Sequence, residues 1–177
     1  MQFTTLFVSM AAAAGLASAA PVEPNIFKAV ASAEGLSFDQ LPLQASTRSL
    51  LVGLSAQGAS CGTPAEDATF QLTAEGELFL YSNAFPKQQL YVDRSGMGRG
   101  KIGYTTGAEP KPKNSERVGF AIQDDVLTFD GEAFSACPAP EGFAIWAGAG
   151  YDATCAALQV KVTESAIAEP NTCLYTS

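Results

Sequence analysis

Short apolar runs, many of them alternating with polar residues, recur along the chain at intervals of roughly 8 to 12 residues. Side chains of a β-strand point alternately to opposite faces, so this period of two predicts strands rather than helices. The predicted strands are 26–31, 49–54, 68–73, 77–81, 89–93, 101–106, 118–123, 126–129, 132–136, 143–147 and 156–162. We therefore expect an all-β fold, an antiparallel β-sandwich or barrel.

Turn residues separate these runs. Gly76 lies in the turn 74–77, and Asp130-Gly131 follows another apolar run, where Asp-Gly supplies the positive φ angles that a tight hairpin needs. A short helical turn is expected around residues 38–44, limited by Pro42. The segment 107–116 has two prolines and charges of both signs, which predicts a flexible flap.

The first residues of the chain carry a different pattern. Residues 1–19 contain no charge, and their apolar run ends in Ala17-Ser18-Ala19, which is typical of a secretory signal peptide cleaved after Ala19. A membrane anchor would need about 20 apolar residues, more than this run provides, and no second long apolar stretch follows. We expect a weakly patterned lead-in over 20–48, a single β domain over 49–177, and no membrane association of the mature protein.

Four cysteines follow the predicted signal peptide, and an even number in an exported chain predicts two disulfides. A metal site made of the four thiolates is disfavoured because the spacing contains no C-x2-C pair. Three pairings are possible. The pairing Cys137 with Cys155 closes a local loop between neighbouring predicted strands, and it leaves Cys61 to pair with Cys173.

The charge of the chain excludes several functions. Its 177 residues hold 10 Lys and Arg, 18 Asp and Glu and no histidine, a net charge of -8, which argues against nucleic-acid binding over a basic surface. The absence of histidine removes imidazole bases and Ser-His-Asp or Cys-His catalysis. A glycosidase pair could still come from the carboxylates Asp93, Asp124, Asp125, Asp130 and Glu132, but several of them lie where turns are predicted. We therefore expect no enzyme and no cofactor.

Positive charge is concentrated in the basic segment, residues 87–117, which holds seven of the ten bases and three acids, so that it is +4 and the rest of the chain -12. Arg94, Arg99 and Lys101 flank glycines there and are the candidate contact residues for an anionic partner; the alternative is a solvated loop whose bases pair with acids of the same protein. The spacing Gly98-x-Gly100-x-x-Gly103 matches a dinucleotide motif, but a β-like run follows instead of a helix, so no nucleotide binding is expected.

The run Tyr91-Val-Asp-Arg-Ser-Gly-Met-Gly-Arg-Gly-Lys-Ile-Gly-Tyr-Thr-Thr-Gly107 closely resembles the PhiA family of fungal phialide cell-wall proteins. The resemblance extends to Leu51-Val-Gly-Leu-Ser-Ala-Gln57, Ala136-Cys-Pro138 and Cys173-Leu-Tyr-Thr176, and it covers nearly all of 49–177. The layout of the cysteines also resembles, more distantly, the C-terminal domain of Pir-type wall proteins, whose glutamine-rich repeats this chain lacks.

The resemblance to PhiA implies a secreted protein of the cell wall with a structural, non-enzymatic role in phialides and conidia during asexual sporulation, together with stress protection. Its partners would then be wall polysaccharide or other wall proteins. The leading alternative is a polysaccharide-binding module that uses the basic segment, and a hydrolase with a carboxylate pair is a third hypothesis.

Overall fold

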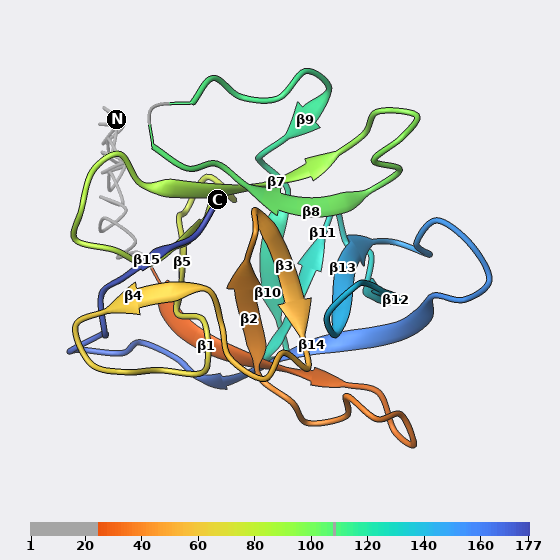
Figure 1. Ribbon diagram of the computed structural model, residues 1–177, viewed down its shortest axis with the longest axis horizontal. Helices are drawn as coiled ribbons and strands as arrows, with labels where there is room; N and C mark the ends of the chain where they lie inside the picture. The colour runs from red at the N-terminus through yellow and green to blue at the C-terminus, as the bar shows by residue number, and fades with distance from the viewer. Residues whose placement is uncertain (1–24, 108) are drawn as a thin grey trace, which may run out of the picture.

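Fifteen β-strands make up the regular structure of residues 25–107 and 109–177, the residues that the computed structural model describes (Figure 1). They are β1 (Asn25–Ser32), β2 (Leu43–Ser46), β3 (Ser49–Val52), β4 (Ala59–Cys61), β5 (Phe70–Leu72), β6 (Leu78–Leu80), β7 (Gln88–Asp93), β8 (Lys101–Tyr104), β9 (Ser115–Glu116), β10 (Phe120–Gln123), β11 (Val126–Phe129), β12 (Phe134–Pro138), β13 (Phe143–Ala147), β14 (Ala156–Glu164) and β15 (Cys173–Tyr175). The predicted signal peptide, 1–19, lies outside the described residues.

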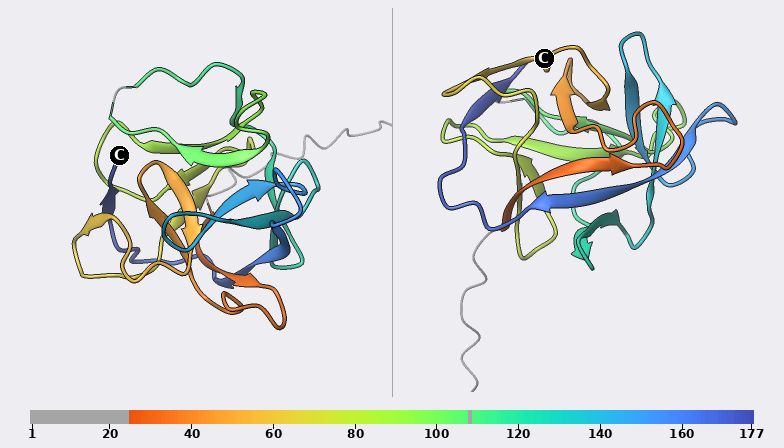
Figure 2. Two further views of the ribbon diagram at one scale, coloured as in Figure 1. Left: turned by 45° about the vertical axis from the view of Figure 1, so that its right-hand side comes forward. Right: turned by 90° about the horizontal axis from the view of Figure 1, so that it is seen from below.

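All strand pairs are antiparallel, and the path of pairing closes on itself. It runs β1-β5-β6-β7-β8-β3-β13-β12-β14, and β14 pairs with β1 again, which gives a barrel. The strands β1 and β14 lie side by side across one edge of the molecule (Figures 1 and 2). The hairpin β10-β11 extends from β14, and β15 forms a separate two-stranded sheet with β4. The predicted all-β, antiparallel fold is confirmed.

The alternating pattern places apolar side chains inside this barrel. In β1, Phe27, Ala29 and Ala31 are buried while their neighbours are partly exposed, as a period of two requires. The strand β3 is buried along its whole length because it has a core on each side. Leu50 faces the main core. Leu51 belongs to a smaller cluster with Cys137 of β12 and Trp146 of β13, against which Cys155 packs.

Residues 25–48, the described part of the lead-in expected over 20–48, form part of the same barrel. Strand β1 pairs with β5 and β14, and β2 pairs with β3. The helical turn expected around 38–44 is absent there: residues 37–40 form a turn and Leu43 begins strand β2. The alternation of β2 is hidden because its Gln44 is buried, where the side-chain amide bonds the backbone of Leu54 and Glu66.

Some other strands begin or end at residues that differ from the predicted ones, for local reasons. The strand expected from residue 132 begins at Phe134, because Asp130 and Gly131 form a tight turn closed by backbone bonds between Phe129 and Glu132. The predicted flap 107–116 ends in strand β9, which pairs with β7. The short strands β4 and β15 were not predicted.

Candidate functional site

The loop between β7 and β8, residues 94–100, is held against strand β13. The indole Nε1 of Trp146 donates a hydrogen bond to the carbonyl of Gly98 at 3.0 Å, and the backbone nitrogen of Ala147 donates to the carbonyl of Gly100 at 2.8 Å. Within the loop, the nitrogen of Gly100 donates to the carbonyl of Asp93 at 2.7 Å. These bonds make the glycine-rich loop an ordered turn.

The glycines of this loop permit close approach of other groups. A Cβ at Gly98 would lie 2.1 Å from the carboxyl carbon of Asp93, and one at Gly100, whose φ is +102°, would lie 2.8 Å from the carbonyl oxygen of Ala147. A Cβ at Gly103 would lie 2.6 Å from the hydroxyl of Tyr91. Strand β8 follows where a nucleotide-binding loop would open a helix, so packing accounts for the glycine spacing.

Arg94, Arg99 and Lys101, here called the basic trio, point to different neighbours. The guanidinium of Arg94 lies 2.7 Å from Glu116 and 3.4 Å from Asp130, and it also lies 5.3 Å from the ring centre of Phe129. Arg94 is therefore an ion-pair partner within the protein, as the alternative interpretation of the basic segment expects.

Arg99 and Lys101 have no ion-pair partner within 4.0 Å in the part of the chain that the structure describes. Arg99, near the end of the loop, is exposed. Its charge contributes to a lowered pKa of Asp152, although hydrogen bonds from Thr154 are the main cause. The Nζ atom of Lys101 lies 5.7 Å from the ring centre of Trp146, a cation–π contact.

The candidate catalytic carboxylates shape turns. Asp124 and Asp125 are the two central residues of the β10-β11 hairpin, with φ of +49° and +60°. Asp130, with φ of +51°, begins the next turn, and Asp93 accepts a hydrogen bond from the backbone nitrogen of Ser95 at 2.8 Å. Backbone conformation explains why Asp is found at these positions, because Asp tolerates positive φ and its side chain accepts hydrogen bonds from the backbone of turns.

Three hollows adjoin one another beside the β2-β3 hairpin, with volumes of about 450, 250 and 260 Å³. They share lining residues: Thr47, Ser49 and Lys101 line the first two, and Arg48 and Tyr91 line the second and third. We call these three adjoining hollows together the hairpin groove. Its polar lining includes Thr47, Arg48, Ser49, Tyr91, Asp93 and Lys101, with Glu141 in the first hollow and Glu109 in the third, and the first hollow is also lined by the apolar residues Leu51, Leu54, Ala139, Pro140 and Ala144.

Tyr91 lies between the second and third hollows of the groove. Its cross-strand partner is Gly103, and the phenol end of the side chain lies over that glycine. Burial raises the pKa of the Tyr91 hydroxyl, and the neighbouring carboxylate of Asp93 adds to the effect. The hydroxyl therefore stays protonated over the physiological range, as a donor and an acceptor.

Arg48 is a groove residue that sequence reasoning missed. It ion-pairs with Glu109 of the predicted flap. With Thr47 it forms the two-residue turn between β2 and β3, and their φ angles are +58° and +47°. Neither residue type favours positive φ, so the sequence carries no turn signal there.

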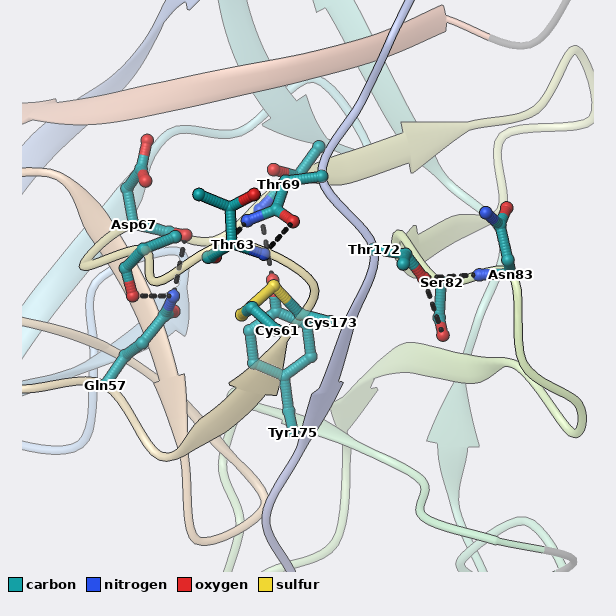
Figure 3. Close-up of a disulfide and its surroundings, with 12 residues drawn as sticks. Gln57, Cys61, Thr63, Asp67, Thr69, Ser82, Asn83, Thr172, Cys173 and Tyr175 are labelled. Atoms are coloured by element: carbon teal, nitrogen blue, oxygen red, sulfur yellow. Dashed lines mark hydrogen bonds between the residues drawn. A yellow bond between two sulfur atoms is a disulfide. The ribbon is translucent and has the colours of Figure 1, made fainter.

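The disulfides Cys61–Cys173 and Cys137–Cys155 are the two pairs that the cysteine spacing favours. The first joins β4 to the segment Thr172–Thr176, here called the terminal strap (Figure 3). In the strap, the hydroxyl of Tyr175 accepts a hydrogen bond from the nitrogen of Thr69 at 3.2 Å. The amide of Gln88 bonds both backbone groups of Tyr175, at 2.8 and 2.9 Å. The strap thus joins elements far apart in the sequence.

The described residues contain neither a membrane-spanning helix nor a metal-binding cluster. No helix within 25–107 and 109–177 has the length and apolar character needed to cross a membrane. Over the same ranges, no cluster of three or more His, Cys, Asp or Glu residues could hold a metal ion.

The geometry defines a disulfide-stapled β-barrel with an ordered glycine-rich loop and an open polar groove. The PhiA-like secreted protein family matches residues 27–176. The chain therefore belongs to the PhiA-like secreted protein family, as its residues indicated.

Relatives named "Cell wall protein phiA" match the chain over nearly its whole length. The protein from Aspergillus niger is 40% identical over 185 residues, which cover 100% of both chains. The protein from Aspergillus fumigatus is 40% identical and covers 96% of this chain and 97% of its own, and that from Arthroderma benhamiae is 31% identical with 85% of each chain covered. No solved structure matches. The protein is a secreted protein of the cell wall.

Proposed function

We propose that the protein is a structural, non-enzymatic component of the wall of phialides and conidia, required for asexual sporulation and for the stress resistance of the spores. The observation that carries the proposal is the match to the PhiA-like family over 27–176, together with relatives named cell wall protein phiA at 40% identity. The resemblance of the run 91–107 to phialide wall proteins supplies the cell type.

The site supports a non-enzymatic role through the positions of its carboxylates. Asp124 and Asp125 occupy the positive-φ positions of a hairpin, and Asp130 occupies that of the next turn. Asp130 also pairs with Arg94. We expect purified protein to release no reducing ends from β-glucan, chitin or mannan. Sustained turnover that disappears in a folded Asp93→Asn or Asp130→Asn variant would contradict this.

The partners in the wall are proposed to be polysaccharide or other wall proteins, contacted electrostatically by the basic trio. Arg99 supports this because it is exposed and unpaired among the described residues, while Arg94 is already paired with Glu116. Sequential extraction of walls with salt, detergent, reductant and mild alkali tests the contact, because each step releases a different class of linkage. We expect release by salt.

Deletion of the gene in the producing fungus tests the developmental role. We expect fewer conidia per colony area and lower survival of those conidia under oxidative and heat stress, both restored by the parent gene. Complementation with a gene that encodes the Cys61→Ala, Cys173→Ala variant is a control that tests whether the role requires the disulfide-stabilised domain. Normal conidiation in the deletion strain would refute the proposed role.

A further inference from the structure

The hairpin groove combines hydroxyl groups with nearly balanced charge. Thr47, Ser49 and Tyr91 contribute hydroxyls, and they adjoin both cationic and anionic side chains. Two cations, Arg48 and Lys101, face three carboxylates, those of Asp93, Glu109 and Glu141, so the groove has a net charge of -1. Such a surface offers many hydrogen bonds but little net attraction for an anion.

The charged groups of the groove are partly satisfied within the protein. Arg48 pairs with Glu109, and Asp93 accepts a hydrogen bond from Ser95. Lys101 is partly buried and held near Trp146, so its Nζ atom has a defined position. Among the residues that the structure describes, it makes no ion pair. A neutral partner with many hydroxyls fits this arrangement better than a charged one.

Tyr91 adds an aromatic surface in the middle of the groove. Its phenol end is supported by Gly103, and the side chain lines the hollows on both sides. A pyranose ring presents C–H groups on its faces and hydroxyls at its edge. An aromatic ring beside hydrogen-bonding side chains is complementary to both.

The groove is formed before any ligand binds. The backbone nitrogen of Arg48 donates to the carbonyl of Thr176 at 3.4 Å, and the hydroxyl of Tyr104 donates to the same oxygen at 2.6 Å. The terminal strap, itself fixed by the Cys61–Cys173 disulfide, therefore holds the hairpin turn in place. A rigid groove loses little conformational entropy on binding, which favours a specific contact.

We propose that the hairpin groove binds a segment of an uncharged linear polysaccharide, with Tyr91 packing against one sugar ring and Lys101 and Ser49 bonding its hydroxyls. The three adjoining hollows favour an extended chain over a small compact ligand. The choice of a polysaccharide rests on the wall location of the protein. The site shares Lys101 with the proposed electrostatic contact, but Arg94 and Arg99 lie outside the groove.

Titration of the purified protein with soluble β-1,3-glucan, chitin oligomers and mannan tests this proposal by calorimetry. We expect saturable binding of at least one of them that changes less than about twofold between low and high salt, because the groove is nearly neutral. Tyr91→Ala should weaken that binding roughly tenfold through loss of the ring. Lys101→Met should weaken it about threefold, since one hydrogen bond is lost. The matched control Lys161→Met, an exposed lysine of β14 outside the groove, should bind like the parent.

Tyr91→Phe separates the ring from the hydroxyl and should retain most of the binding. In the parent protein, chemical-shift changes on adding the bound glycan should cluster at Thr47, Ser49, Tyr91 and Lys101, which tests the site even where Tyr91→Ala does not fold. Absence of binding to all three glycans would overturn the proposal. So would binding that maps elsewhere, or binding only of a phosphorylated mannan that is lost at high salt. These assays use purified protein, so their failure leaves the sporulation proposal standing, and normal conidiation in the deletion strain would leave this site standing.

Discussion

Removal of the Cys61–Cys173 disulfide should destabilise the protein more than removal of Cys137–Cys155. The first bond spans 112 residues and the second 18. A cross-link stabilises by restricting the unfolded chain, and the loop-entropy relation gives about 4.8 kcal/mol for the long loop and about 3.2 kcal/mol for the short one. The difference is about 1.6 kcal/mol, and the long bond also ties down the terminal strap, in which Tyr175 is hydrogen-bonded to Thr69 and Gln88.

Thermal and urea unfolding of two double variants measure this difference. Alanine is the suitable replacement in both, because Cys137 and Cys173 are buried and a serine hydroxyl would add its own cost. We expect Cys61→Ala, Cys173→Ala to lower Tm by about 15 °C and Cys137→Ala, Cys155→Ala by about 10 °C, for a domain of this size. Equal losses, or a larger loss for the short loop, would refute the entropic reasoning.

Three further predictions concern the loop, the wall contact and the strap. Gly100→Ala should lower the free energy of unfolding by about 2 kcal/mol, because its Cβ would meet the carbonyl of Ala147 at a positive φ, whereas Gly96→Ala, which meets nothing within 4 Å, should change it by less than about 1 kcal/mol. Replacing all three residues of the basic trio by Ser should release the protein from the wall at lower salt with little change in Tm. Unchanged retention would show that the loop is only a structural turn and makes no contact with the wall. Burial raises the pKa of Tyr175 to about 12, so the unfolded chain ionises first, and the free energy of unfolding should fall by about 2 kcal/mol between pH 10 and pH 12. Tyr175→Phe should show a smaller alkaline loss, and an equal loss would exclude this cause.

The strands with clear alternation were predictable because the period of two is a local property. Phe27, Ala29 and Ala31 alternate with less buried residues in β1, and the buried Leu158 and Val160 alternate with exposed residues in β14. Strands of two or three residues leave no such pattern. The strand β15 pairs with β4, more than a hundred residues away, and the sequence of either segment alone does not predict this pairing.

The candidate site was predictable only in part. Composition located the basic segment, but it could not show that Arg94 turns toward Glu116 while Lys101 turns toward Trp146. The contact between Trp146 and Gly98 joins residues 48 positions apart, so the packing role of the glycines depended on the tertiary structure. The groove could not be predicted for the same reason. It depends on the turn of Thr47 and Arg48, which the terminal strap holds in place from far along the chain.

The terminal strap sets an order of events during synthesis. Strand β1 pairs with β14, which is synthesised more than a hundred residues later, and β4 pairs with β15, which is synthesised later still. The barrel therefore cannot close until residues 156–175 have left the ribosome. Contacts of such long sequence separation form slowly, and unpaired strand edges expose the chain to aggregation meanwhile. Closure of the barrel therefore takes place in the secretory lumen, where the oxidant that joins Cys61 to Cys173 is present. In a cell, secretion efficiency should depend on lumenal oxidation as much as on the stability of the finished barrel.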